Sequence, residues 1–181
     1  TLFLTVIAQT ATCSCWPPRA RCGCGRSGAK ASTENLLAKG LKSIEPTSPY
    51  AVNVPGAIEA WGAILKAHGT WPLDRILAPA IKYAEHGFPV AARVASDWKG
   101  LVGKLGNSPG ATKHYLPSGK APEEGDIVKL PALAETLKAI AKGGPRAFYE
   151  GPVAQDMVAT LQARGSVLSL EDFASHRGEA V

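Results

Sequence analysis

Residues 54–90 set the architecture of this chain, because they hold two helix signals in direct succession. The stretch opens with Val-Pro-Gly-Ala-Ile-Glu-Ala-Trp at residues 54–61. Pro55 suits the first turn of a helix, where its missing N–H needs no partner, and Gly69 suits the end of that helix. The spacing places three apolar side chains on one face of the predicted helix: Ile58, Trp61 and Leu65.

The second half of this stretch begins again at Pro72 and closes with Leu-Ala-Pro-Ala-Ile-Lys-Tyr-Ala-Glu-His-Gly-Phe-Pro-Val at residues 77–90. A proline inside a helix removes a hydrogen bond and clashes with the preceding turn, so Pro79 predicts two short helices here. We interpret Trp61 and Tyr83 as packing residues. The apolar positions recur at helical spacing and predict a face toward a core: Ile76, Leu77, Ala80, Ile81 and Ala84.

A second ordered stretch, residues 125–151, opens with Gly-Asp-Ile-Val-Lys-Leu-Pro-Ala-Leu-Ala-Glu-Thr-Leu and closes with Ala-Phe-Tyr-Glu-Gly. Pro131 opens a predicted helix, and Gly143 and Gly144 mark its end. Its apolar positions are Leu133, Leu137 and Ile140. A further helix before Gly165 is indicated by Val153, Met157 and Leu161.

Shorter elements flank these two stretches. Ser32 or Thr33 can cap a predicted helix that ends at Gly40 in a left-handed conformation. Ser169, followed three residues later by Asp172, predicts a capping box at the start of a last short helix.

Residues 99–125 show many glycines and prolines and little periodicity. We predict a loop there, with a hairpin around residues 115–129. The apolar run at residues 2–7, Leu-Phe-Leu-Thr-Val-Ile, is too short to span a bilayer and suits a buried strand.

Length and charge bound the class of protein. With 181 residues and 45% apolar residues, the chain can build one ordinary domain core. The net charge is +5, but lysines and arginines are spread along the chain and interleaved with acidic residues. A nucleic-acid-binding face needs clustered basic residues with aromatic side chains between them, so we do not expect a nucleic-acid partner.

All four cysteines lie within residues 1–28, an irregular segment that differs in composition from the rest: Cys13, Cys15, Cys22 and Cys24. Within each Cys-x-Cys pair one residue separates the two cysteines, whereas most structural zinc sites have two to four residues between them. Disulfide bonds among the four cysteines would allow three connectivities. Because the segment looks like a shifted reading frame, we hypothesise a frame disturbance between about Ile7 and Gly25, which sequencing of the encoding DNA tests.

The sequence contains no local catalytic constellation. The four histidines are scattered, and no zinc-binding His-Glu-x-x-His motif or glycine-rich phosphate loop is present. Two adjacent acidic pairs, Glu123-Glu124 and Glu171-Asp172, suit turns and caps and do not face each other across a substrate. The residues alone therefore predict no site chemistry.

As a set and in this order, the motifs of residues 54–90 and 125–151 resemble the large subunit of gamma-glutamyltransferases, the family that includes cephalosporin-acylase-like enzymes. The resemblance implies an α+β fold, with residues 29–181 forming the helix-rich part of an N-terminal-nucleophile hydrolase αββα sandwich. That sandwich is incomplete in this chain. No initiator methionine opens the sequence, so we expect a piece of a longer product.

The resemblance also implies an activity and a partner. Family members cleave themselves, and a threonine freed at the start of the small subunit transfers a gamma-glutamyl group, for example from glutathione, to water or an acceptor amine. We expect the small subunit from the same precursor as partner, no cofactor and no catalytic residue in this chain. The fragment is then inactive and poorly soluble alone, and the complete enzyme is periplasmic or secreted.

One residue matches a substrate-binding position of the family. The large subunit supplies an arginine that pairs with the substrate α-carboxylate, and Arg26 is the candidate here. Its surroundings read Gly25-Arg26-Ser27-Gly28, where many members carry Phe-Arg-Glu, so acylase-like substrates remain open.

Two other classes of function stay open. A non-catalytic helical interaction module, or a pseudogene-like product on the same scaffold, would be favoured by a native stop codon after Val181. A zinc-binding module would use the four cysteines, and metal analysis of the purified protein tests it.

Overall fold

The structure is a computed structural model that describes residue 40, residues 44–45 and residues 47–178. An antiparallel pair of strands, β1 (Phe88–Pro89) and β2 (Ile127–Val128), is the sheet of this part. The helix-rich architecture is thus confirmed for the described residues. The helices are η2 (Pro49–Ala51), α3 (Ala57–His68), α4 (Leu73–His86), α5 (Ala92–Gly106), α6 (Pro109–Tyr115), η3 (Pro117–Gly119), α7 (Pro131–Glu150), α8 (Pro152–Ala163) and α9 (Leu170–Ser175).

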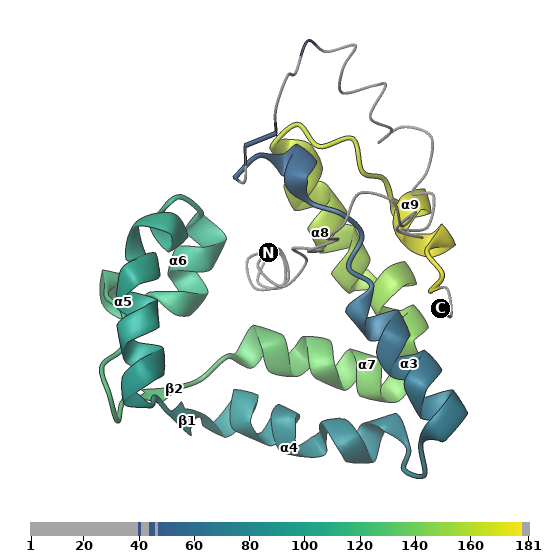
Figure 1. Cartoon of the computed structure of the whole chain (residues 1–181), viewed down its shortest axis with the longest axis horizontal. Coiled ribbons are helices and arrows are strands. Elements are labelled where there is room, and N and C mark those ends of the chain that lie inside the picture. Colours follow the sequence, from purple (N-terminus) through teal and green to yellow (C-terminus); the bar gives the residue numbers. More distant parts are fainter. Residues whose placement is uncertain (1–39, 41–43, 46, 179–181) are drawn as a thin grey trace, which may run out of the picture.

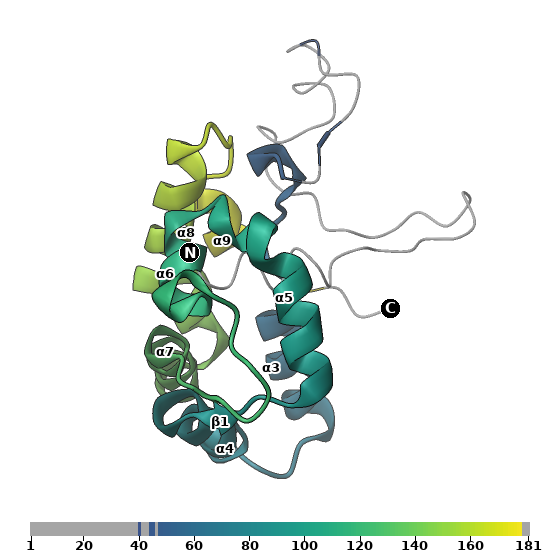
Figure 2. The same cartoon turned by 90° about the vertical axis from the view of Figure 1, so that its left-hand side faces the viewer.

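Helices α4 and α7 lie side by side and run in opposite directions (Figure 1). Leu77 of α4 and Leu137 and Ile140 of α7 share one buried cluster. Where α4 ends and α7 begins, the amide of Leu130 donates to the carbonyl of Ala84 over 2.8 Å. Viewed from the side, the two helices are stacked one above the other (Figure 2). Apolar burial of Leu77 against α7 joins this pair to the main core.

The main core continues from this pair to α3, α8 and α9. The predicted apolar positions Met157 and Leu161 of α8 are buried there, as are Ile58 of α3 and Phe173 of α9. The capping box is also confirmed, since the Ser169 hydroxyl accepts from the amide of Asp172 while the Asp172 carboxylate accepts from the amide of Ser169. Gly40 has a φ of 73°, as predicted, whereas the helix expected before it lies outside the described residues.

The prediction that Pro79 divides two helices is wrong. Helix α4 runs unbroken from Leu73 to His86 with Pro79 inside it. Pro79 is exposed, so water can reach the carbonyl that loses its partner. Leu77 and Ala84, one on each side of the proline, are both buried, and Leu77 packs in one cluster with Leu137 and Ile140 of α7. Tertiary packing outweighs the local cost of the proline.

The loop predicted for residues 99–125 is also wrong in large part. Residues 92–106 form α5, and Pro109 opens α6 behind a cap from the Ser108 hydroxyl. Three glycines of α5 that weakened the helix signal face open space, so they cost propensity but no packing: Gly100, Gly103 and Gly106. The two helices pack on each other through Leu105 and Ala111.

The predicted hairpin at residues 115–129 is absent from the described part. Ile127 and Val128 pair instead with Pro89 and Phe88, about forty residues earlier in the chain. Pairing at this distance leaves no local sequence signal. The strand pair joins the α5–α6 unit to the end of the α4–α7 pair (Figure 1).

The predicted helix end at Gly143-Gly144 is a kink inside α7. Gly144 has a φ of 68°, which a residue with a side chain rarely adopts, and the helix resumes at Pro145. The kink brings Pro145 against α3, where a Cβ added to Gly62 would lie 2.5 Å from the Pro145 ring. A glycine at position 62 therefore allows α3 to approach α7.

The interpretation of Trp61 and Tyr83 as packing residues is wrong for the described part. Trp61 is 37% exposed and Tyr83 is 59% exposed. Ile76, predicted to face the core, is exposed as well. Within the residues that the structure describes, no helix is both long and apolar enough to cross a membrane.

Candidate functional site

The residue that the family resemblance singles out, Arg26, lies outside the described residues. So do the four cysteines and the hypothesised frame disturbance. Among the described residues, no group of three or more histidine, cysteine, aspartate or glutamate side chains is arranged to hold a metal ion. Two candidate sites in the described part are a groove and a partly buried polar cluster.

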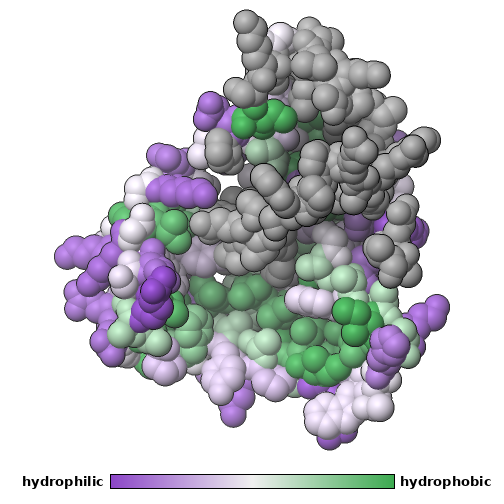
Figure 3. Space-filling view, viewed as in Figure 1, coloured by the Kyte–Doolittle hydropathy of each residue, from purple (hydrophilic) through white to green (hydrophobic). Residues whose placement is uncertain are grey.

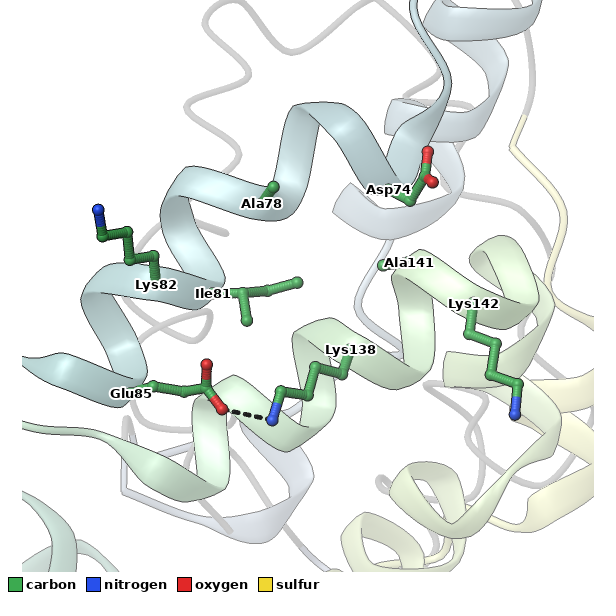
Figure 4. A pocket seen from close by; sticks show the side chains of 8 residues that line it. All are labelled: Asp74, Ala78, Ile81, Lys82, Glu85, Lys138, Ala141 and Lys142. Carbon is green, nitrogen blue, oxygen red and sulfur yellow. Dashed lines mark ion pairs between the residues drawn. The ribbon is translucent and has the colours of Figure 1, made fainter.

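The groove lies between α4 and α7 and has a volume of about 560 Å3 (Figure 4). Lys138 of α7 forms an ion pair across the groove with Glu85 of α4 and a second one with Glu135 on its own helix. The hydrogen bond to Glu85 raises the pKa of Lys138, and the same bond lowers the pKa of Glu85. The lining residues are Asp74, Ala78, Ile81, Lys82, Glu85, Lys138, Ala141 and Lys142.

The Lys138–Glu85 ion pair links the two helices but does not form a reaction centre. Lys138 and Glu85 are both partly exposed, so solvent screens their interaction. The groove contains no hydroxyl or thiol nucleophile beside a base. We therefore interpret it as a solvated helix seam.

The polar cluster comprises Glu59, Arg146, Tyr149 and His176, where α3, α7 and α9 meet (Figure 1). Tyr149 is fully buried, and its hydroxyl donates to the Pro55 carbonyl over 2.6 Å and accepts from the Glu59 amide over 3.1 Å. Burial raises the pKa of Tyr149 to about 12, so the phenol keeps its proton at neutral pH. Tyr149 thereby fixes the start of α3.

His176 lies over the same end of α3. Its ring stands 5.2 Å from the ring of Tyr149, and a Cβ added to Gly56 would lie 3.6 Å from its Nε2 atom. Among the described residues, neither Nε2 of His176 nor Oε2 of Glu59 has a hydrogen-bond partner, although both atoms are shielded from solvent. A buried basic nitrogen and a buried carboxylate oxygen thus belong to one cluster.

Arg146 closes the cluster on the side of α9. Its guanidinium donates to Glu150 on α7, to the carbonyl of Ala174 over 2.6 Å and to the carbonyl of His176 over 3.2 Å. Arg177 donates to the same two carbonyls. Two arginines therefore satisfy the backbone carbonyls at the end of α9, which a helix terminus leaves without internal partners.

The cluster ties the last described residues to α3 and α7. It offers general acid and base groups but, among the described residues, no hydroxyl or thiol nucleophile beside them other than the protonated Tyr149. Sequence reasoning missed it, because Glu59 and Tyr149 are 90 residues apart in the chain. The sequence signal that could have pointed to the cluster is Tyr149 in the Phe-Tyr-Glu-Gly motif, but the motif does not show what the tyrosine hydroxyl binds.

We expect the stability of the chain to fall in mild acid through His176. Burial lowers the pKa of His176; the nearby Glu59 opposes this, and Arg146 and Arg177 reinforce it. The folded chain then binds the proton less tightly than the unfolded chain, so protonation favours unfolding. The free energy of unfolding should decrease as the pH drops through the ordinary histidine pKa of 6.5, and level off below the folded pKa.

Urea unfolding at about pH 8 and at about pH 5.5 measures this dependence. His176→Gln should reduce it. Burial also lowers the pKa of His114, so His114→Gln should remove a further part. An unchanged pH dependence in His176→Gln would contradict the assignment.

Comparison with known proteins shows to which family this helical scaffold belongs. The family model for gamma-glutamyltranspeptidase matches residues 11–181. The chain belongs to the gamma-glutamyltranspeptidase family. The family expected from the sequence motifs is thereby confirmed.

Two curated members of the gamma-glutamyltranspeptidase family show the extent of the match. The chain is 37% identical over 160 residues to the glutathione hydrolase-like YwrD proenzyme of Bacillus subtilis, covering 87% of this chain and 30% of that protein. It is 35% identical over 158 residues to the oxamate amidohydrolase proenzyme of Klebsiella pneumoniae, covering 83% and 30%. The chain thus spans about a third of the length of these relatives.

A solved structure extends the likeness to three dimensions. The cephalosporin acylase of Bacillus halodurans superposes with a TM-score of 0.78 at 33% identity, covering 86% of this chain and 30% of that one. The fold class expected from the resemblance, the helix-rich part of an incomplete αββα sandwich, is therefore confirmed.

Proposed function

We propose that this chain is part of the large subunit of a proenzyme that transfers a gamma-glutamyl group from an amide such as glutathione to water or an acceptor amine. The match of the gamma-glutamyltranspeptidase family model over residues 11–181 carries the proposal. Both curated relatives are proenzymes, which supports a precursor that is processed into two subunits.

In this proposal the reacting groups come from the small subunit. A threonine hydroxyl at its new N-terminus attacks the amide carbonyl while its own α-amine takes the hydroxyl proton. The amide C–N bond breaks, the departing amine takes up that proton, and water or an acceptor amine then releases the acyl group from the threonine oxygen. Donors from the same subunit stabilise the developing oxyanion. The present chain contributes the helical layer and Arg26, whose planar fork fits the substrate α-carboxylate.

The 181-residue chain alone should therefore release no product from gamma-glutamyl-p-nitroanilide above the buffer rate. The complete precursor, produced from the encoding DNA extended downstream, should process itself and turn the substrate over. If the isolated chain released p-nitroaniline, and this activity stayed with the chain through every purification step, the absence of a catalytic nucleophile would be contradicted. A precursor that continues in frame but neither processes nor reacts would favour a non-catalytic scaffold.

Arg26→Ala in the complete precursor tests the carboxylate contact. A charged hydrogen-bond pair contributes about 1.5–3 kcal/mol, so we expect KM for the gamma-glutamyl substrate to rise about 10- to 100-fold with processing unchanged. Arg26→Lys should recover part of the loss, and Arg164→Ala, an exposed arginine after α8, is the matched control. An unchanged KM in Arg26→Ala would remove Arg26 from the binding site.

An acylase-like or amidohydrolase activity is the second candidate. The segment Gly25-Arg26-Ser27-Gly28 differs from the Phe-Arg-Glu of many gamma-glutamyl enzymes, and the relatives include an oxamate amidohydrolase and a cephalosporin acylase. Comparing kcat/KM of the complete enzyme for gamma-glutamyl-p-nitroanilide, oxamate and a glutaryl amide distinguishes the two. We also propose a periplasmic or secreted location, which cell fractionation of the producing organism tests.

A further inference from the structure

The unit formed by α5, α6, η3 and the residues directly beside them, 91–122, is called the arm below, and it carries a surplus of positive charge. Its basic residues are Arg93, Lys99, Lys104, Lys113 and Lys120, and its one acidic residue is Asp97. In the rest of the described part, acidic residues outnumber basic ones. The structure therefore gathers in one unit a charge that looks evenly spread along the sequence.

The four lysines of the arm have their charges available to an external partner. Each lysine is exposed, and none forms an ion pair with another described residue. Arg93 differs, because its guanidinium pairs with the carboxylate of Asp97 over 3.0 Å. The one acidic side chain of the arm is thus already engaged, and the lysines keep their full charge toward solvent.

The apolar side chains of the arm are turned inward. Leu105 of α5 is buried against α6. The two aromatic residues of the arm, Trp98 and Tyr115, pack against the apolar clusters at its base and between its helices. Lys99 and Lys104 lie on the remaining, exposed surface of α5. The outward side of the arm therefore presents charge, while its aromatic rings are used for packing.

The arm stands at the edge of the molecule. In Figure 1, α5 lies along the left-hand margin, and the strand pair at its foot joins it to the α4–α7 pair. The space-filling view shows hydrophilic side chains over this margin (Figure 3). Figure 2, which views the molecule from this margin, shows α5 and α6 in front. A large, flat partner can therefore reach the arm before it meets the helices of the main core.

We propose that the arm holds the protein at an anionic lipid surface through its four lysines. The charge of the arm is spread over two helices and the turn that follows them. Anionic headgroups form a flat layer of diffuse negative charge that attracts such lysines without a fixed geometry. The association is peripheral and reversible, and salt weakens it because salt screens exposed charges.

A nucleic acid is the other large polyanion that attracts lysines, and the arm fits it less well. Proteins bind single strands by stacking bases on aromatic side chains, whereas Trp98 and Tyr115 are packed inside the arm. Reading a duplex requires side chains that reach base edges from a helix in the groove. Between its lysines the exposed surface of α5 carries Gly100 and Gly103, which have no side chain to offer.

Vesicle flotation of the full 181-residue chain tests the proposal, because aggregated protein sediments while lipid-bound protein rises. Vesicles with about one-third phosphatidylglycerol in phosphatidylcholine are compared with pure phosphatidylcholine vesicles, at about 0.1 M and about 0.5 M salt. The chain should float with the anionic vesicles at the lower salt and be released at the higher salt. Equal flotation with both kinds of vesicle would overturn the proposal, as would no flotation with either.

A pair of double variants locates the contact. Each lysine near an anionic surface strengthens binding about fivefold, so Lys99→Gln with Lys104→Gln should bind the anionic vesicles about 20- to 30-fold more weakly. The matched control, Lys82→Gln with Lys142→Gln, removes the same charge from exposed positions on α4 and α7 and should bind nearly as the natural chain does. Equal losses in the two double variants would show an effect of net charge alone and overturn the proposal.

A second measurement uses the natural chain and covers the case in which a variant does not fold. A water-soluble reagent acetylates lysines with and without anionic vesicles, and mass spectrometry gives the rate at each lysine. Vesicles should slow acetylation of Lys99, Lys104 and Lys113 and leave Lys82 and Lys142 unchanged. Protection of all five lysines alike would overturn the proposal. Duplex DNA that protects the arm better than vesicles at the same concentration of negative charge would overturn it in favour of a nucleic acid.

Discussion

Tyr149→Ala is expected to lower the free energy of unfolding by about 4 kcal/mol, because it removes a fully buried aromatic ring and two hydrogen bonds. The ring contacts Phe148 edge to face, with centroids 5.1 Å apart, and lies inside the main core. A typical domain has only about 5–15 kcal/mol in total, so this variant should be partly unfolded at room temperature.

Tyr149→Phe separates the hydroxyl from the ring. It keeps the packing but leaves the Pro55 carbonyl and the Glu59 amide without this partner, and we expect a loss of about 1–3 kcal/mol. Tyr83→Phe is the matched control, since Tyr83 is 59% exposed, and it should change stability by less than about 0.5 kcal/mol. Urea unfolding followed by circular dichroism measures all three variants. Equal stabilities of Tyr149→Phe and Tyr83→Phe would show that the hydroxyl bonds contribute nothing.

Gly62→Val is expected to cost about 2–3 kcal/mol by pushing α3 away from α7. A Cβ at position 62 would lie 2.5 Å from Cγ of Pro145, and a proline ring held in a helix cannot swing aside as a long side chain can. Valine also loses side-chain freedom in a helix. Gly62→Ala should show a smaller loss with the same sign.

Gly100→Ala is the matched control, because Gly100 is also a helix glycine but has open space around a Cβ. It should stabilise the chain by about 0.5–1 kcal/mol through helix propensity alone. Thermal unfolding of Gly62→Ala and Gly100→Ala, each compared with the natural chain, shows whether the midpoint temperature falls or rises. If Gly62→Ala and Gly100→Ala shift the midpoint in the same direction, the close approach of α3 to α7 is wrong.

The sequence alone determined those features of this protein that depend on neighbours a few residues away. The apolar spacing of α7 and α8, the capping box at Ser169 and the left-handed Gly40 are of this kind, because helical periodicity and caps act within one or two turns. Ordered motifs, read as a set, also identified the family. Arg26, its candidate substrate contact, stays a prediction.

Only the tertiary structure decided what residues far apart in the chain do to one another. Packing on α7 keeps α4 continuous through Pro79, and pairing across about forty residues makes the β1–β2 sheet. The polar cluster joins Glu59 to Tyr149 and His176, a contact that no local pattern encodes. Trp61 is exposed because α3 meets α7 through the side that carries Ile58. Several sides of this helix carry apolar residues, so the sequence alone does not show which side is buried.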